Sequence, residues 1–207
     1  EELLEYDGNF LSDLRDISDP VVAGQLLRAS QSIYIRKNTV IIETGEVQSY
    51  IPFLRQGIVR GYLLDADGRD ITDCFVHRPG SIIMACNAPG TPAHINMETM
   101  TDCEITAIPL NVVASVLDTN LELMKIYNRY LVAALESHWE GKMIMHRYSA
   151  MERYKWFLYK YPGIIDRVSN KHIASFLGMT PVTLSRLRRR VREEEQGFDG
   201  CGNEAGG

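Results

Sequence analysis

Seven short runs rich in β-branched and aromatic residues follow one another between residues 31 and 110. We expect each run to be a β-strand: 32–35, 39–42, 50–54, 58–64, 70–76, 81–84 and 104–108. Turn signals that contain glycine separate them: Gly45-Glu46, Gln56-Gly57, Asp67-Gly68, Pro79-Gly80 and Pro89-Gly90. Many short, evenly spaced strands are typical of an antiparallel sandwich or barrel, and an Asp-Gly pair favours a hairpin turn. This part of the chain therefore predicts a β domain.

Helical patterns flank the β domain. Residues 3–30 place apolar side chains at helical spacing, interrupted near Pro20, and predict short helices that cover it. Residues 111–147 contain no proline and a single glycine, Gly141, and predict a helix of about 25 residues, about 38 Å long. Its apolar stripe needs a partner, either a second copy of the chain or the chain's own β domain. The helix can also pack against both, on different faces. The expected homodimer seam comprises Met124, Tyr127, Asn128, Leu131, Leu135 and His138.

Charge is segregated along the chain. The formal net charge is -5, yet residues 142–192 hold twelve lysines and arginines against only Glu152 and Asp166. This segment therefore carries +10, and the rest of the chain carries -15. Such a division indicates two domains with different partners, the basic one drawn to a polyanion, most simply nucleic acid. The alternative is a solvated surface with uneven charge.

The basic segment opens with two helix-start signals. Ser149 and Glu152 form a capping box, and Pro162 ends the helix that they open. Ser169 can cap the next helix. We therefore expect a helix after Ser149 and a second one after Ser169.

A third helix follows after a short turn. Gly178 stands where the second helix can end in the left-handed conformation, and Thr180 caps the third helix, with Pro181 at its first position. The side chains expected to face inward from both helices are Ile173, Ala174, Leu177, Leu184, Leu187 and Val191. A helix, a tight turn and a helix with apolar inner faces, beside clustered arginines, is the helix-turn-helix pattern of DNA-binding proteins. A helical hairpin that serves only as a scaffold is the alternative.

The composition of the chain excludes several other classes of protein. Apolar residues make up 45% of the chain and charged residues 24%, which excludes a largely disordered or collagen-like chain. No apolar run reaches the roughly 18 residues of a membrane span, and the acidic start is unlike a signal peptide. We expect a cytoplasmic protein without membrane contact. Its four cysteines lack CxxC spacing and predict free thiols, with neither a disulfide framework nor a metal site.

The whole chain, from about Ser30 to Arg192, resembles the Crp/Fnr transcription regulators, relatives of the cyclic-AMP receptor protein. The segments that carry the resemblance are Leu54–Tyr62, Asp67-Gly68, Pro79-Gly80, Thr101–Ile105 and Ile173–Arg186. The ending Thr180–Arg186 also resembles regulators from Bacteroidetes-type bacteria. The resemblance implies an α+β bacterial protein with a cyclic-nucleotide-binding β-roll, of double-stranded β-helix or RmlC-like jelly-roll type. It places N-terminal helices and β-roll in 1–110, a dimerisation helix in 111–147 and a helix-turn-helix domain in 148–192. We expect residues 193–207 to be a disordered tail, with no evident wing strands.

The sensor region departs from this family. Cyclic-nucleotide-binding members use a Gly-Glu pair for the ribose and an Arg-Ser or Arg-Thr pair for the phosphate. The matching positions here hold Met84-Ala85 and Ala93-His94, and no lysine or arginine occurs from Pro79 to Met124. A buried phosphate needs a cation and oriented donors. We therefore expect no cofactor and no cyclic AMP, and an effector pocket that is empty or takes an apolar or neutral ligand. The expected pocket residues are Met84, Ala85, Cys86, Ala93 and His94.

Other sensors of this family fit less well. An iron–sulfur sensor needs an N-terminal cysteine cluster, and this chain has no cysteine before Cys74. A haem sensor could use His77, His94 or Cys86, although a lone histidine on a strand is usually an ordinary residue. A thiol sensor could use Cys74, Cys86 and Cys103, but no activating cation stands near them in sequence, so inert thiols are favoured.

The family match also implies how the chain would contact DNA. The expected base-reading positions are Pro181, Val182, Ser185 and Arg186. The expected phosphate contacts are Thr180, Thr183, Lys171, His172, Arg189 and Arg190. The expected partners are double-stranded DNA, a second copy of the chain and RNA polymerase.

The sequence leaves two alternatives to a DNA-binding regulator. One is a cyclic-nucleotide-fold module whose basic end binds a protein. The other is a cupin-type enzyme, which would need clustered metal ligands. The five histidines are scattered, and only His77 and His94 fall in the β domain, so we expect no enzyme activity.

Overall fold

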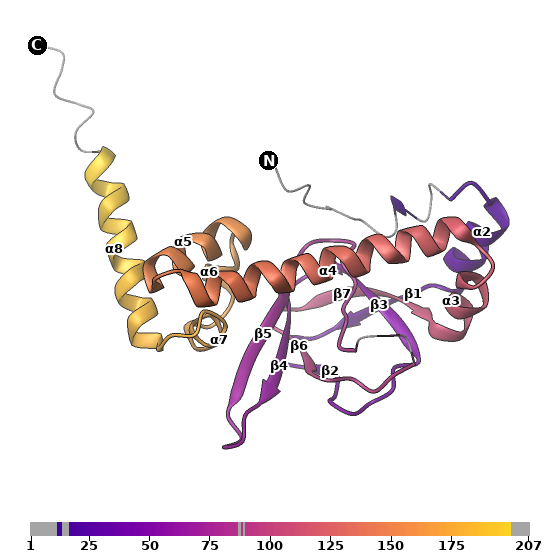
Figure 1. Cartoon of the computed structure of the whole chain (residues 1–207), viewed down its shortest axis with the longest axis horizontal. Helices are drawn as coiled ribbons and strands as arrows, with labels where there is room; N and C mark the ends of the chain where they lie inside the picture. Colours follow the sequence, from indigo (N-terminus) through magenta and orange to yellow (C-terminus); the bar gives the residue numbers. More distant parts are fainter. Residues whose placement is uncertain (1–11, 14–16, 87, 89, 200–207) are drawn as a thin grey trace, which may run out of the picture. The chain divides into compact units, whose positions relative to one another are not determined.

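The computed structural model describes residues 12–13, 17–86, 88 and 90–199, with side chains up to Glu194. It divides into two units, Glu1–Lys142 and Met143–Gly207, which are described separately. The first unit holds two antiparallel sheets and the helices that pack on them, and the second unit is helical (Figure 1). The expected α+β class and β-roll architecture are confirmed.

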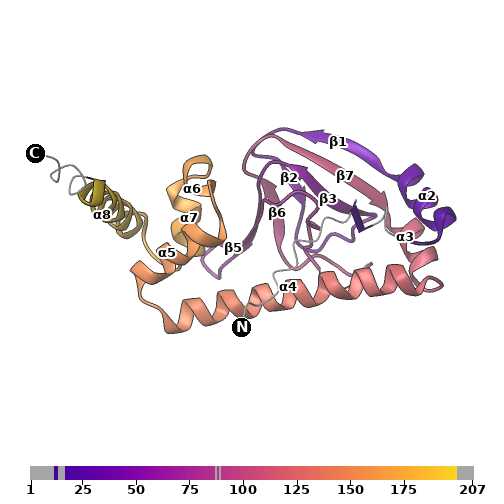
Figure 2. The same cartoon turned by 90° about the horizontal axis from the view of Figure 1, so that it is seen from above.

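Seven strands form the two sheets of the first unit. One sheet has the order β1 (Gln31–Ile35), β7 (Cys103–Pro109), β3 (Tyr50–Gln56). The other has the order β2 (Val40–Ile42), β6 (Asn96–Thr99), β4 (Val59–Leu64), β5 (Asp70–Val76). Figure 2 shows the strands from a second direction, with α4 running alongside them. Side chains from both fill the roll: Ile42, Leu54, Val59, Ile83, Ala85, Ala93, Met97, Cys103 and Ile105.

Six of the seven expected strands are present, and two differences stand out. Residues 81–84 do not form a strand, because only Ile82 makes a bridge, to Phe53. The strand β6 was not expected from its sequence, yet it lies between β2 and β4. The hairpin between β4 and β5 turns at Gly68, whose φ of 77° is the left-handed backbone that an Asp-Gly turn supplies.

Helices cover one face of the β-roll. They are α2 (Pro20–Ala29), α3 (Leu110–Leu117) and the first part of α4 (Leu121–Arg147). Their apolar sides pack with Phe53 and Ile108 in a second core, so part of α4 binds its own β domain, as the second alternative expected. The single helix expected over 111–147 is two helices. The break falls before Leu121, where the Asn120 side chain accepts the Leu123 N–H at 2.9 Å and caps α4.

The second unit contains α5 (Ala150–Lys160), α6 (Ile164–Arg167), α7 (Asn170–Phe176) and α8 (Pro181–Asp199). The predicted capping box is confirmed, because Ser149 and Glu152 each accept the other's backbone N–H. Ser169 precedes α7, but its side chain makes no capping hydrogen bond. The core face of α5 packs against α7 through an aromatic cluster of Trp156, Phe157, Tyr161 and Phe176.

The helix α8 runs further than expected. Residues 193–199 are helical, so the expectation of a disordered tail is wrong there, and residues 200–207 lie outside the described residues. Arg189 and Arg190 make i,i+4 ion pairs with Glu193 and Glu194, which favour continuation of the helix. The described residues of the second unit, up to Asp199, contain no strand and therefore no wing strand.

Candidate nucleic-acid interface and sensor pocket

A tight turn joins α7 to α8. Ala174 of α7 and Leu177, the residue that caps the end of α7, are fully buried, as is Leu184 of α8. Gly178 has φ of 60°, and the N–H of Met179 donates to Ala174 O at 2.9 Å. Small Ala174 lets the second helix approach closely, and glycine permits the left-handed turn. The two helices are thus fixed by packing as the sequence predicted.

The first turns of α8 present an uncovered side. Thr180 caps the helix, because its Oγ1 accepts the Thr183 N–H at 3.1 Å. All four expected base-reading residues are exposed: Pro181, Val182, Ser185 and Arg186. They lie away from the buried Leu184, and no ion pair of the described residues engages Arg186.

The expected phosphate contacts differ in accessibility. Lys171, Arg189 and Arg190 are exposed, whereas His172 is half-buried with its Nδ1 covered. The hydroxyls of Thr180 and Thr183 lie 2.9 Å apart, and Thr180 already acts as a cap. Exposed ion pairs contribute little, so Arg189 and Arg190 stay available to another anion.

Arg188 has a different role from its neighbours. Its Nη2 pairs with Asp166 at 2.6 Å and its Nη1 donates to Ile165 O at 3.3 Å. It therefore ties α8 to α6. One signal for this role is visible in the sequence, because Asp166 is one of only two acids in residues 142–192.

The five residues expected to form an effector pocket divide between two places. Ala85 and Ala93 are buried in the core of the β-roll, and the backbone N–H of the exposed His94 donates to Ala85 O at 2.7 Å. Met84 and Cys86 are half-buried and line a pocket against the helices. That these five residues hold an effector stays a prediction.

The pocket that the structure does show lies between β3, the segment after Ile82, and helices α3 and α4. Its lining is Gln48, Tyr50, Ile51, Pro52, Phe53, Ile82, Ile83, Met84, Cys86, Ala88, Gly90, Leu110, Val113, Leu117, Leu123, Tyr127 and Tyr130. These lining residues include no lysine, arginine, aspartate or glutamate. Burial, and next the nearby Cys86, raises the pKa of Tyr127.

Comparison with known proteins identifies this architecture. The family model described as a cyclic nucleotide-binding domain matches residues 32–120. A structure assigned to the Crp/Fnr family of transcriptional regulators, from Eubacterium rectale, superposes with a TM-score of 0.70 and 16% identity, over 87% of each chain. The chain has the Crp/Fnr fold.

Two more solved structures share the Crp/Fnr fold with this chain. FixK2 from Bradyrhizobium japonicum gives a TM-score of 0.71 at 21% identity, over 80% of this chain and 86% of that one. The c-di-GMP-responsive global regulator CLP from Xanthomonas campestris gives 0.63 at 15%, over 86% and 93%. No curated protein matches the sequence.

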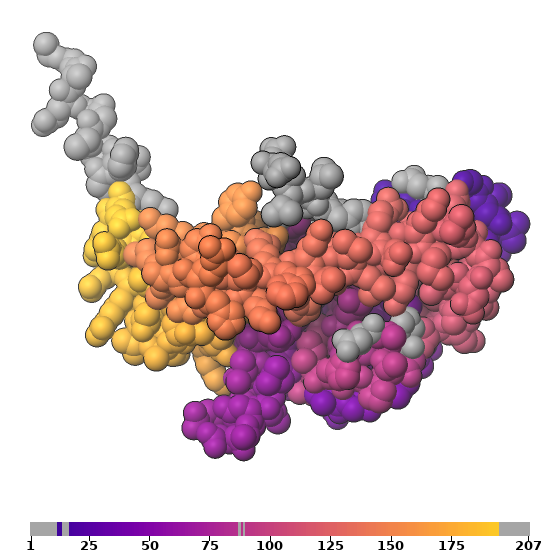
Figure 3. Space-filling view, viewed as in Figure 1, coloured from indigo at the N-terminus to yellow at the C-terminus, as the bar shows by residue number. Residues whose placement is uncertain are grey.

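The long helix of the Crp/Fnr fold, α4, carries an uncovered apolar stripe. Leu135, one of the expected seam residues, is 58% exposed, and Val132 and Trp139 beside it are 52% and 55% exposed. Figure 3 shows this helix uncovered along one face of the molecule. Among the other expected seam residues, Asn128 and His138 are exposed and Met124 is 36% exposed, whereas Leu131 is half-buried.

Tyr127 lies on the side of α4 that faces the β-roll. It is half-buried and lines the pocket on the β-roll, so it is not part of the uncovered stripe. The apolar positions Val132 and Trp139 were not in the expected seam, although Leu135 is three residues from one and four from the other. That spacing is the signal that would have found them.

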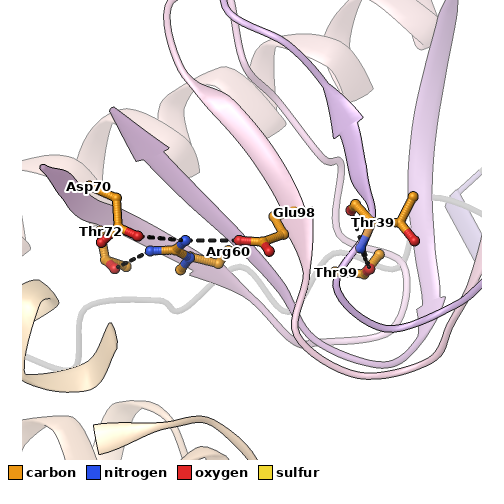
Figure 4. A network of polar contacts seen from close by, with 6 residues as sticks. All are labelled: Thr39, Arg60, Asp70, Thr72, Glu98 and Thr99. Carbon is orange, nitrogen blue, oxygen red and sulfur yellow. Dashed lines mark hydrogen bonds and ion pairs between the residues drawn. The ribbon is translucent and has the colours of Figure 1, made fainter. Parts of the chain in front are cut away.

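A charge network on the second sheet was not expected from the sequence. The Arg60 side chain is 2% exposed, and its Nη2 contacts Glu98 Oε2 at 2.8 Å and Asp70 Oδ2 at 3.4 Å (Figure 4). Its Nη1 donates to Thr72 Oγ1 at 3.1 Å, and its guanidinium lies 4.4 Å from the centre of the Tyr62 ring. Nearby, the Thr39 N–H donates to Thr99 Oγ1 at 3.0 Å. The network ties three strands, β4, β5 and β6, together.

The described cysteines are free thiols. Burial, and next the charge of Asp73, raises the pKa of Cys74 to about 12, so its reactive thiolate is scarce at neutral pH. Cys103 is buried, whereas Cys86 is half-buried and its Sγ donates to Ala88 O at 3.3 Å. Cys201 lies outside the described residues. In the part of the chain that is described, no three His, Cys, Asp or Glu residues gather as metal ligands. No described helix is long and apolar enough to span a bilayer.

Proposed function

We propose that this protein is a DNA-binding transcriptional regulator of the Crp/Fnr type that acts as a homodimer on a two-half-site operator. The observation that carries the proposal is the exposed start of α8. There Arg186 stands uncovered beside Val182 and Ser185, within a segment of charge +10. A fixed helix with an uncovered arginine in a basic segment fits the electrostatics and shape of a duplex groove.

We propose that α8 is the recognition helix and that its N-terminal half enters the major groove. The Arg186 fork suits the O6/N7 edge of guanine, and such a pair discriminates by about 1–3 kcal/mol. Pro181 and Val182 offer only apolar contact, such as to a thymine methyl. Lys171, Arg189 and Arg190 are proposed to neutralise phosphates, with Thr180, Thr183 and the less accessible His172 beside them. Phosphate contacts set affinity and register, and base contacts set sequence preference.

We propose further that the sensor does not bind cyclic AMP through the chemistry of the cyclic-nucleotide-binding members. Ala85 and Ala93 occupy positions where those members place a glutamate and an arginine, and both pack inside the roll. Burying a phosphate without a cation is costly. We propose RNA polymerase as a further partner, because a regulator bound at a promoter acts on the polymerase. The proposed location is the cytoplasm, where the regulator and the polymerase meet DNA.

The test compares two arginines of α8. First, the preferred sequence is selected from random DNA with the wild-type chain, and affinities for it and for scrambled DNA are measured between 50 and 200 mM salt. Arg186→Ala should lower the preference for the selected sequence by about tenfold to a hundredfold while retaining salt-sensitive binding to scrambled DNA. Arg190→Ala, the matched control, should weaken both equally and reduce the salt slope by about one.

Two outcomes would contradict the proposal. If Arg186→Ala keeps the full preference for the selected sequence, Arg186 does not read bases. If the wild-type chain binds no DNA even at 50 mM salt, the basic segment serves a protein partner instead, and the regulator proposal fails.

A further inference from the structure

The segment 82–86 separates two different spaces. Ile83 and Ala85 join the core of the β-roll, where the family resemblance would place a cyclic nucleotide. Ile82, Ile83, Met84 and Cys86 line the pocket against the helices, so Ile83 borders both spaces. Ala85 belongs only to the roll core, whereas Met84 and Cys86 belong only to the pocket. The pocket on the helix side is therefore distinct from the position of a cyclic nucleotide inside the roll.

The walls of this pocket come from both the β-roll and the helices. Phe53 of β3 and Met84 form one side, and Val113 of α3 with Leu123 and Tyr127 of α4 form the other. Its described lining is apolar apart from the hydroxyls, one thiol and Gln48, and holds no acidic or basic side chain. An ion that entered would lose its hydration without gaining a partner. The chemistry of the walls thus favours an uncharged molecule.

Tyr127 supplies a polar anchor. It is half-buried, and its hydroxyl makes no hydrogen bond to any residue that the structure describes. A tyrosine hydroxyl is protonated at neutral pH, and burial raises the pKa of Tyr127 further, so this hydroxyl can donate as well as accept. A mainly apolar pocket with a few placed polar groups is the usual form of a small-molecule site.

We propose that this pocket binds an uncharged, mainly apolar small molecule that carries one hydroxyl or carbonyl group, and that Tyr127 holds that group. Such a ligand would contact α4 and β3 at once. The proposal concerns binding to the first unit alone and does not rest on DNA binding. A failure in the DNA experiment therefore leaves it intact, and the reverse also holds.

The test uses 1-octanol as the neutral probe and octanoate as its charged match, titrated by calorimetry into the full chain without DNA. We expect saturable binding of one 1-octanol per chain, and at least tenfold weaker binding of octanoate. Tyr127→Phe should weaken 1-octanol binding about fivefold. Tyr34→Phe is the matched control, because its hydroxyl bonds Asp102 outside the pocket, and it should leave binding unchanged.

A second measurement locates the probe. Alkylation by N-ethylmaleimide, resolved by peptide, should be slowed at Cys86 when 1-octanol is present, because this thiol lines the pocket. Met84→Trp, designed to fill the pocket, should abolish binding while the chain still unfolds cooperatively. If that variant does not fold, Tyr127→Phe and the alkylation of Cys86 still decide.

Four results would each overturn the proposal. The first is an absence of saturable 1-octanol binding. The second is octanoate binding as tight as that of 1-octanol, which would show that the walls do not select against charge. The third is an affinity of Tyr127→Phe for 1-octanol equal to that of Tyr34→Phe. The fourth is alkylation of Cys86 at the same rate with and without 1-octanol.

Discussion

Arg60 shows how one side chain can hold a sheet together. Its side chain is nearly inaccessible to solvent, while the side chains of Asp70 and Glu98 are each 20% exposed. The cation therefore relies on these partners for its solvation, and they rely on it to offset their mutual repulsion. Removing one member of such a buried group leaves uncompensated charge, which costs more than the pairing itself contributes.

We expect Arg60→Ala to lower the free energy of unfolding by about 3 kcal/mol, because Asp70 and Glu98 would then face each other across β4 without a cation. The matched control is Arg69→Ala, which removes an ion pair to Asp67 whose side chains are 76% and 68% exposed. That control should change stability by less than about 1 kcal/mol. Urea unfolding measures both. Equal effects of the two variants would refute the structural role of Arg60.

At the scale of single residues, the sequence predicted the helix caps and turns, which depend on residues close by in the chain. The Thr180 cap, the Ser149 and Glu152 box and the left-handed Gly178 each depend on neighbours within about four residues. The Arg60 network depends on strand register, because Arg60 and Glu98 are direct cross-strand partners 38 residues apart. Nothing in the local pattern near Arg60 identifies that partner.

At the scale of helices and strands, the two differences between predicted and observed strands follow from burial. Residues 96–99 have little strand propensity, yet Met97 and Thr99 are fully buried between two other strands, and tertiary pairing makes them a strand. Residues 82–84 are apolar because Ile83 is buried in the roll and all three border the helix-side pocket. A short apolar run cannot by itself distinguish that situation from a strand.

Two glycines in helical regions give opposite predictions for the same substitution. Gly178 ends α7 at φ of 60°, and a Cβ there would lie 3.3 Å from Arg153 Nη1. We expect Gly178→Ala to cost about 1 kcal/mol of stability and to weaken DNA binding by displacing α8. Gly141 lies within α4, and a Cβ there would meet nothing within 4 Å. Gly141→Ala should therefore stabilise the chain, by up to about 1 kcal/mol.

Thermal unfolding and DNA titration of both variants test this pair. If Gly178→Ala proves as stable as the wild-type chain, the left-handed turn does not constrain α8. A destabilising Gly141→Ala would instead indicate that another surface approaches α4 closely at this position.

At the scale of the whole molecule, the Crp/Fnr resemblance and the residue pattern predicted the order of the domains along the chain. They predicted less well which side chains fill the β-roll and which line a pocket. The order of β-roll, long helix and basic helical end could be read from where strand-like runs give way to a proline-free stretch and then to clustered arginines. The positions of Ala85 and Ala93 could be aligned with ligand-binding positions of the family. Their burial in the roll, and the pocket on its other side, depend on how all the apolar side chains pack together.

The proposed homodimer rests on the uncovered stripe of α4, and it yields a sharp test. Leu135 is 58% exposed beside Val132 and Trp139, so Leu135→Glu would place an unpaired carboxylate in the seam and should weaken dimerisation roughly a hundredfold. Leu64→Glu, at an equally exposed leucine on the β4–β5 hairpin, is the matched control and should leave the dimer intact. Sedimentation equilibrium at micromolar concentration measures this. Two half-sites about 34 Å apart need the two recognition helices of a dimer. Leu135→Glu should therefore also lose affinity for the operator while it retains binding to a single half-site. A wild-type chain that sediments as a monomer, with and without operator, would show that the stripe serves another purpose.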